Sequence, residues 1–462
     1  MTDPIAQDED TISDDEKLDA IMACPELYES GLLFAEATTR PLTYPRWVFV
    51  LFLLMNDVYL SNRKASSSLN YSVWRRIRRK AKKRGYPLPR KPPSRTWFAK
   101  TRERHLTDDV KRGLDDLLLT MGLSVAQETG LLDAPDVILY GDGKVQTPRY
   151  STSPGDMRWV TSVVDGEPVK IRVPVVNCDP TAKTHWTGDH KQVHGNKFVM
   201  IYLRGGRTHE RVTLGVEWVP DDKGQHNSEM DLGMGLMRRT LACEQRISDV
   251  NWDTAMKGVH RNEVQRDYGV NTHAPITAKS VNPKTDKRVE KARHLRFHEL
   301  TYNDGTTEEV DLWYEGGWVC QRIVLDDGTT ALERLTHRGH KRTRNHSGGY
   351  RMNVIYDLPC PRGGPPHTIY ERTWNTAEDD ACGLNRPENI LLSPPGSGEH
   401  QRLYGRRSDS ETVNNMSDKA LDDRKARSLG GPRQALDRWA FAFVTNAICR
   451  KKYSRRRQAL AA

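Results

Sequence analysis

Three acidic residues stand where they could together carry out chemistry on a phosphodiester. In VILYGDGKV, Asp142 follows the apolar residues VILY at the predicted end of a strand. Asp253 follows the run RISDVNW, and Glu411 lies in SDSETVNNMSDKAL, which is predicted to be helical. A buried carboxylate is costly without a compensating partner. Three carboxylates can hold two divalent ions, Mg²⁺ or Mn²⁺, which activate an attacking oxygen and stabilise a leaving one. We therefore take these three acids as candidate metal ligands and catalytic residues, and Glu411 joins the two aspartates through the resemblance described below.

Each acid also has an ordinary interpretation that the sequence leaves open. Asp142 could belong to an Asp-Gly turn that ends a strand, and Asp253 could cap the helix that follows it. Glu411 could be a surface residue of its helix, and Glu371 in HTIYERTW competes for its place.

The elements predicted around the acids favour an α/β fold with an RNase H-like core. The predicted elements are strands at 136–140, 197–205 and 211–219, a helix at 227–242, a strand at 246–252 and a helix at 254–269. The strands at 197–205 and 211–219 are predicted to form a hairpin. In an RNase H-like fold the first and fourth strands lie side by side, so the acids that follow them can meet. A third carboxylate comes from a late helix packed on the sheet.

The chain is basic, and its cations are most concentrated between Tyr71 and His105. The formal net charge is +10, which favours a polyanionic partner such as nucleic acid. The stretch YSVWRRIRRKAKKRGYPLPRKPPSRTWFAKTRERH interleaves aromatic residues with cations, a pattern suited to phosphate contact. The alternative is a solvated helix face. The cations that we predict to contact DNA here are Arg75, Arg76, Arg78, Arg79, Lys82 and Lys83.

Four stretches of the chain resemble the DDE transposases of bacterial insertion sequences. The resemblance is to the branch whose catalytic domain is interrupted by a β-rich insertion before the final Glu. The four stretches are ILYGDGKV, HGNKFVMIYL, VNWDTAMKGVHRNEVQRDYGV and YGRRSDSETVNNMSDK. Their order along the chain matches that of the family, and the alternating, turn-rich sequence from Leu295 to about Tyr370 accounts for the long spacing before Glu411.

The last of these stretches carries a family signature of Tyr, Arg, Glu and a basic residue. Tyr404, Arg407 and Glu411 fall on its spacing. Lys419 lies one residue beyond the expected basic position, which Asp418 occupies. The resemblance implies that Tyr404 and Arg407 contact a phosphate near the cut, and Lys419 is a candidate DNA contact with them.

The resemblance implies a two-step reaction on DNA at the three acids. Water would first attack the phosphodiester at the end of the mobile element, and the freed 3′-hydroxyl would then attack target DNA. The implied partners are terminal inverted repeats, target DNA and a second copy of the chain. Lys197 could face the active site or merely begin its strand.

The chain divides into five predicted segments. They are a disordered acidic tail at 1–17, a helical basic DNA-binding region at 18–128, a first part of the core at 129–294, a β-rich insertion with linker at 295–395, and a last part of the core with C-terminal helices and a basic tail at 396–462. The most apolar run, WVFVLFLLM, is too short to cross a bilayer and is predicted to be a buried helix. Seven scattered cysteines without a CxxC pair favour a reducing, cytoplasmic location. The implied DNA partner would place the protein with the nucleoid.

Other functions fit parts of the same pattern. A nuclease or resolvase of the same fold would use the same acids without strand transfer. A catalytically inactive or repurposed DNA-binding protein would keep the basic surface, and the acid at position 418 leaves room for it. A basic RNA-binding protein is a third alternative, although the sequence has no motif for an aromatic platform.

Overall fold

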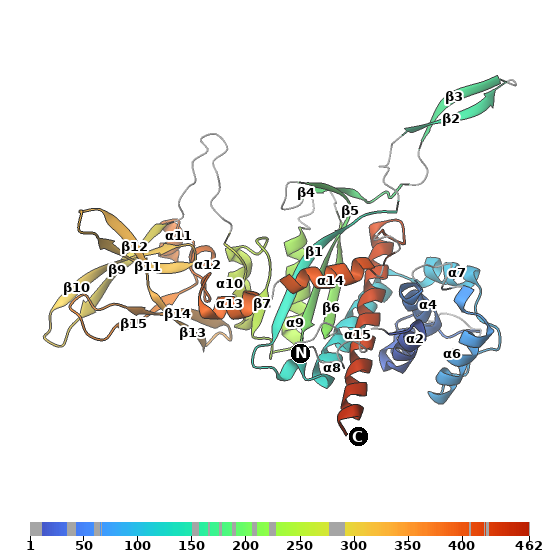
Figure 1. Cartoon of the computed structure of the whole chain (residues 1–462), viewed down its shortest axis with the longest axis horizontal. Coiled ribbons are helices and arrows are strands. Elements are labelled where there is room, and N and C mark those ends of the chain that lie inside the picture. Colours follow the sequence, from blue (N-terminus) through green and yellow to red (C-terminus); the bar gives the residue numbers. More distant parts are fainter. Residues whose placement is uncertain are drawn as a thin grey trace, which may run out of the picture. The chain divides into compact units, whose positions relative to one another are not determined.

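The computed structural model of the chain is a mixed α/β structure, in agreement with the predicted fold class (Figure 1). It describes residues 12–34, 43–59, 65, 67–149, 157–164, 167–174, 178–186, 191–205, 210–220, 228–276, 292–405, 408–419, 421 and 425–461. Within these ranges the side chains of 157–158, 162–164, 172–174, 408–412 and 419 are not described. The chain forms two compact units, which are Met1–Pro135, Gly141–Thr240 and Ser410–Ala462 in the first, and Asp136–Tyr140 and Leu241–Asp409 in the second.

The N-terminal part of the first unit is helical, as the sequence predicts. Its elements are α2 (Asp14–Ala23), α3 (Pro25–Glu29), the 3-10 helix η1 (Ser30–Leu33), α4 (Trp47–Val58), α6 (Tyr71–Lys83), α7 (Arg95–His105), α8 (Asp108–Glu128) and the 3-10 helix η2 (Leu131–Asp133). Every residue of α4 is buried, so the prediction of a buried helix for WVFVLFLLM is confirmed. Within the described residues, no helix is both long and apolar enough to span a bilayer.

Helix α2 corrects the prediction of an acidic disordered tail reaching Lys17. The helix begins at Asp14 because Ser13 and Glu16 form a capping box, in which each side chain bonds the other residue's backbone N–H. Asp19 of the same helix lies 2.7 Å from an Arg76 nitrogen on α6. Residues 1–11 of the predicted tail lie outside the described residues.

The central sheet has six strands, and β1 lies between β5 and β7 in it. The strands are β1 (Ile138–Gln146), β4 (Lys183–Trp186), β5 (Gln192–Arg204), β6 (Arg211–Val219), β7 (Asp249–Asn251) and β8 (Asn271–His273). β5 and β6 form the predicted antiparallel hairpin, while β7 is parallel to both β1 and β8. The sequence between β1 and β4 contributes a separate hairpin of β2 (Met157–Val164) and β3 (Glu167–Pro174), where the run PVKIRVPVV predicts an extra strand.

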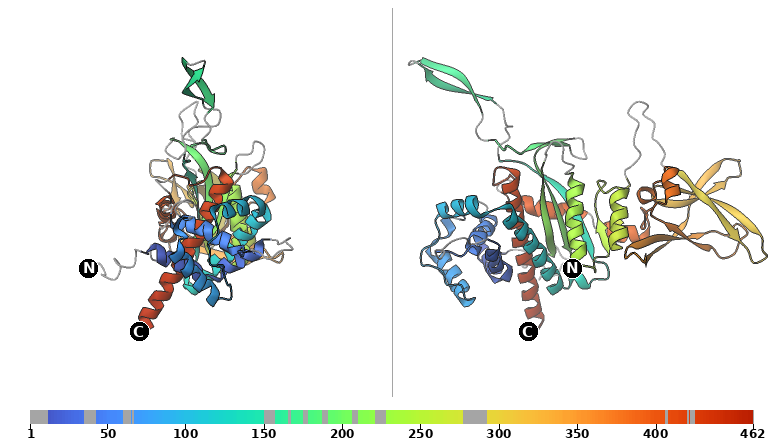
Figure 2. Two further views of the ribbon diagram at one scale, coloured as in Figure 1. Left: turned by 90° about the vertical axis from the view of Figure 1, so that its right-hand side faces the viewer. Right: turned by 180° about the vertical axis from the view of Figure 1, so that it is seen from behind.

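The sequence pattern predicts four of the five helices that lie between and after these strands, but for RPENILLSPPGSGEHQRLYGRR it predicts a loop, where a helix from Gly398 to Tyr404 forms instead. The five helices are α9 (Glu229–Cys243), α10 (Gly258–Tyr268), α13 (Gly398–Tyr404), α14 (Ser408–Lys419) and α15 (Gly431–Ala461). α10 ends where predicted, at Gly269, whose φ of 67° suits glycine. In the first unit α15 packs against β6, α8, α4 and α2 (Figure 2).

The predicted β-rich insertion is present in the second unit as two antiparallel sheets around one core. The first sheet joins β9 (Arg293–Thr301), β10 (Thr307–Glu315), β11 (Trp318–Val324) and β12 (Thr330–Arg334). The second joins β13 (Thr336–Arg344), β14 (Tyr350–Leu358) and β15 (His367–Arg372), followed by α11 (Ala377–Ala381) and α12 (Arg386–Asn389). The sequence predicts turns at Asn-Asp-Gly, Glu-Gly-Gly and Asp-Asp-Gly, and these turns connect adjacent strands of the first sheet. Gly305, Gly316 and Gly328 adopt positive φ there.

Candidate active site

Helix α14 lies along the face of β1 that carries Asp142. Asn414 Nδ2 donates a hydrogen bond of 2.7 Å to Asp142 Oδ2. Two residues further along the strand, Lys144 Nζ lies 3.1 Å from Asp418 Oδ2. Positions 142 and 144 share one face of a strand, and positions 414 and 418 are one turn apart on a helix. The two contacts therefore fix both the orientation and the register of α14 on β1.

Glu411 lies in the backbone of α14, as predicted, one turn before Asn414. The Glu411 and Lys419 side chains are not described, and Arg407 lies outside the described residues. Tyr404 is the last residue of α13, where its ring stacks on His400 with centroids 4.9 Å apart.

Asp253 lies two residues after the last residue of β7 that pairs with β1, and Asp142 lies two residues after the last residue of β1 that pairs with β7. In the second unit Tyr140 pairs with Asn251 in parallel register, and each aspartate comes two residues later. Asp253 Oδ1 accepts a 2.8 Å hydrogen bond from the Ala255 backbone N–H in a local turn. Helix α10 begins at Gly258 after the N-cap Lys257, so Asp253 is not its cap.

Asp418 is held between two cations. Besides Lys144, Arg438 Nη2 on α15 lies 3.6 Å from Asp418 Oδ1. Arg438 Nε also donates a 2.8 Å hydrogen bond to Gln146 Oε1 on β1. Burial lowers the pKa of Arg438 to about 10, against the opposing attraction of Asp418. Position 418, where the sequence resemblance implies a basic residue, thus carries an acid that contacts two basic side chains.

Sequence reasoning missed these neighbours of the candidate acids. Asn414 could have been found, because it lies three residues after Glu411 on the predicted helix. Lys144 could have been found from its alternation with Asp142 along the predicted strand. Arg438 has no signal in the sequence, because its contacts join elements far apart along the chain.

Lys197 is on β5 and forms an ion pair with Glu229 on α9. The Glu229 carboxylate also lies against the backbone of β1, where a Cβ at Gly143 would overlap it. Gly143 alternates with Asp142, so this contact is on the opposite face of the strand. Lys197 therefore supports the packing of α9 on the sheet.

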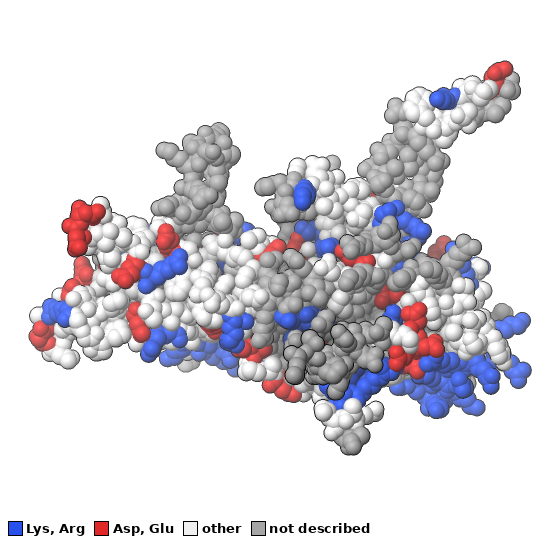
Figure 3. Space-filling model, viewed as in Figure 1, with Lys and Arg blue, Asp and Glu red and all other residues white. Residues whose placement is uncertain are grey.

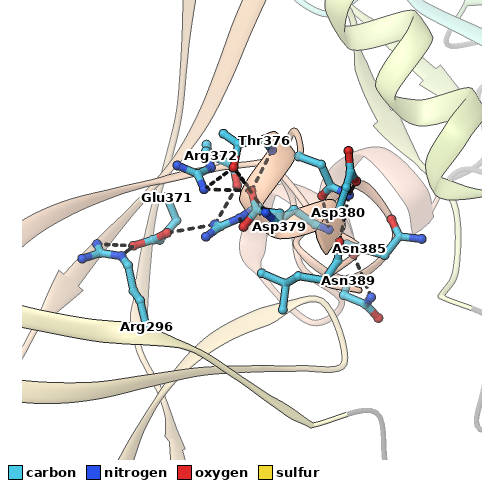
Figure 4. Close-up of polar contacts among 11 residues, drawn as sticks. Arg296, Glu371, Arg372, Thr376, Asp379, Asp380, Asn385 and Asn389 are labelled. Atoms are coloured by element: carbon cyan, nitrogen blue, oxygen red, sulfur yellow. Dashed lines mark hydrogen bonds and ion pairs between the residues drawn. The ribbon is translucent and has the colours of Figure 1, made fainter. Parts of the chain in front are cut away.

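Glu371, the rival for the third carboxylate, belongs to an ion network inside the insertion (Figure 4). Its side chain is 3% exposed, and Arg386 Nη1 lies 3.3 Å from Glu371 Oε2. Arg296 binds the other carboxylate oxygen. Arg386 Nε also lies 3.0 Å from Asp379 Oδ1, which joins the two acids through one guanidinium. With both oxygens engaged by arginines, Glu371 does not suit the role of a metal ligand.

The same network makes the insertion sensitive to acid. Burial raises the pKa of Asp379, but hydrogen bonds from Thr376, Arg386 and Arg372 outweigh it and hold the pKa at about 2. A depressed pKa stabilises the fold above the ordinary value of 3.8, and this stabilisation is lost as the pH falls toward 2. We expect the melting temperature of the insertion to fall as the pH is lowered from about 4 to 2. Circular dichroism at each pH measures it. Asp379→Asn should flatten this dependence, and an unchanged profile would contradict the assignment.

Helix α6 presents part of its predicted DNA-contacting set to solvent. Arg75, Arg79, Lys82 and Lys83 are exposed and recur on one face of the helix. Figure 3 shows Lys and Arg gathered over this part of the molecule. The other two members have internal partners. An Arg76 nitrogen lies 2.6 Å from Asp15 Oδ2, and Arg78 Nε donates a 3.0 Å hydrogen bond to the Leu88 carbonyl.

Neither a recognisable group of metal ligands within the described residues nor a match to a known protein accompanies the candidate site. Among the side chains that the structure describes, which do not include Glu411, no three His, Cys, Asp or Glu residues form a group that could hold a metal ion. No family model matches the sequence, and no curated protein matches it either.

Proposed function

We propose that the chain is a metal-dependent DNA transposase with an RNase H-like catalytic core. The observation that carries the proposal is the parallel register of β1 and β7, which gives Asp142 and Asp253 equal offsets beyond paired residues. The hydrogen bond from Asn414 to Asp142 adds the third element, because it sets the helix that carries Glu411 against β1.

The three acids suit divalent metal binding by their chemistry. Mg²⁺ and Mn²⁺ prefer oxygen ligands and need few protein ones when DNA phosphate oxygens complete the shell. Asp142, Asp253 and Glu411 would hold two such ions, which activate an attacking oxygen and stabilise a leaving one. Asn414 would orient the Asp142 carboxylate through its amide hydrogen bond, since partners of metal ligands fix their geometry.

The remaining residues of the proposed site would bind DNA. Tyr404 and Arg407 would contact the phosphate near the cut, with Lys419 beside them. The reaction would cut at the ends of the element and join the freed 3′-hydroxyl to target DNA. Two copies of the chain would act together, so that both ends are processed in one assembly.

The exposed cations of α6 would supply sequence-independent DNA affinity. We expect replacement of Arg75, Arg79, Lys82 and Lys83 by Gln to lower the slope of log affinity against log salt by about three to four, because each phosphate contact contributes about 0.9. Fluorescence anisotropy with a labelled duplex at several salt concentrations measures it.

Arg76→Gln is the matched control for this helix, because Arg76 is bound to Asp15 and Asp19. It should change the salt slope by less than about one unit. Equal slopes for the fourfold variant and the native protein would remove α6 from the DNA-binding surface.

The decisive experiment uses the DNA that flanks the coding region as substrate. Purified protein, Mn²⁺ and a donor plasmid carrying both flanks are incubated with a target plasmid, and joined products are sequenced. Joined element–target products support the transposase. Cleavage without joining identifies a nuclease of the same fold, and binding without cleavage identifies a DNA-binding protein that lacks catalysis.

A further inference from the structure

A cavity of about 400 Å³ lies within the first unit, and none of the proposed catalytic residues lines it. Four elements form it, namely α8, β6, α9 and α15. Its wall is largely apolar and includes Trp218, Leu232, Leu436 and Trp439. Two carboxylates, Asp115 and Glu217, also line it.

The two carboxylates lack a direct partner. Within the described part of the chain, neither Asp115 nor Glu217 has a hydrogen bond or ion pair through its carboxylate. The charge of Arg239 acts on both, but its guanidinium is bound to Asp116 at 2.5 Å. Burial raises the pKa of Asp115 to about 7, and the neighbouring charge of Glu217 adds to the effect. A pair of acids in an apolar cavity is unfavourable until a cation joins it.

The aromatic walls of the cavity are fixed in place. Trp439 Nε1 donates a 2.9 Å hydrogen bond to the Leu114 carbonyl. The Trp218 ring lies against the backbone at Gly431, where a Cβ would overlap the indole. A preformed apolar pocket with a few polar groups is the usual form of a small-molecule site.

We propose that this cavity binds an organic cation, an ammonium group on an apolar stem. The ammonium would pair with Asp115 and Glu217, and the stem would contact the indoles and leucines. A divalent metal fits less well, because two carboxylates among apolar side chains offer too few oxygen ligands. Two cations, Lys111 and Arg112, also line the cavity, but each forms an ion pair with an acid of its own helix. Lys111 Nζ lies 2.8 Å from Asp108, and Arg112 binds Asp109.

The proposed affinity depends on pH through Asp115. Binding needs its ionised form, so the affinity should rise about tenfold from pH 6 to pH 8 while an alkylamine stays protonated. The charged groups around Asp115 are Glu217 on β6, Asp108, Lys111, Arg112 and Asp116 on α8, and Arg239 on α9. The residues of α15 that line the cavity carry no charge.

Isothermal titration calorimetry of the full chain, without DNA, tests the proposal. At pH 8 benzylamine should bind with one site, and its neutral isostere benzyl alcohol at least tenfold more weakly. Asp115→Asn combined with Glu217→Gln should weaken benzylamine binding at least tenfold, while Asp326→Asn, a change at an exposed acid of the insertion, leaves it unchanged. The double variant should melt no lower than the native protein, because it removes unpaired carboxylates.

Three results would overturn the assignment. They are equal binding of the amine and the alcohol, native affinity in the double variant, or displacement of benzylamine by stoichiometric Mn²⁺. Sedimentation velocity separates two sources of the cation. A dimer that dissociates on adding benzylamine assigns the cation to a basic side chain of a second copy, whereas a monomer that binds benzylamine assigns it to a free amine.

Discussion

Asp142→Asn should lower Mn²⁺-dependent cleavage of donor DNA by more than about 100-fold, because loss of even an outer partner of a metal ligand typically costs 10–100-fold. The change keeps the size of the side chain and removes its charge. It leaves the neighbouring Asn414 amide beside another amide in place of a carboxylate. Initial cleavage rates on a supercoiled donor plasmid measure the effect.

Two further variants make this result specific. Asn414→Ala should lower the rate by about 10–100-fold, as expected for a residue that orients a ligand. Asp109→Asn should have no effect, because that acid is exposed and pairs with Arg112 on its own helix. If Asp142→Asn and the native protein cleave at the same rate, the catalytic assignment fails and a basic DNA-binding protein remains.

Arg386→Met should lower the free energy of unfolding of the insertion by about 3–5 kcal/mol, because it removes the buried cation that bridges two buried carboxylates. Arg386 is 3% exposed and bridges Glu371 and Asp379, which are also buried. Arg296 and Arg372 would still reach these acids from the periphery. Urea titration followed by hydrogen exchange of β14 and β15 measures the loss.

Matched variants separate the buried network from ordinary surface charge. Arg362→Ala removes an exposed arginine that pairs with Asp304 and should cost less than about 1 kcal/mol. Adding Glu371→Leu to Arg386→Met should recover part of the loss, since an apolar replacement of a buried ion pair is often tolerated. A loss below 1 kcal/mol for Arg386→Met would show that the network contributes little.

The strands of the insertion, β1 and β7 could be predicted from the sequence because their signals are local. β1 nevertheless continues to Gln146, so Asp142 lies within the strand and not at its predicted end. That β1 and β7 are neighbours is expected from the fold order and not from local pattern. Alternating apolar residues and Asp-Gly turns define the hairpins of β9–β12, and the turn glycines adopt the expected positive φ. The position of Glu411 on a helix also follows from local pattern. What that helix faces is set by long-range contacts, such as Asn414 with Asp142, which no local pattern records.

Helix α2 shows the opposite failure of local reasoning. The acidic sequence before Lys17 is typical of disordered tails, because like charges repel and few apolar residues are available. The structure compensates these charges with distant cations, since Asp15 pairs with Arg76 on α6 and Glu16 pairs with Arg455 on α15. Composition alone cannot reveal that a partner of opposite charge lies elsewhere in the chain.

The pairing of Asp418 with Lys144 and Arg438 limits which side chains position 418 can carry. Placing lysine there would set three positive charges against one another where one acid now balances two bases. Lys144 or Arg438 would have to change first or at the same time. The acid at this position is therefore coupled to its neighbours, and a single exchange of Asp418 for a base is disfavoured.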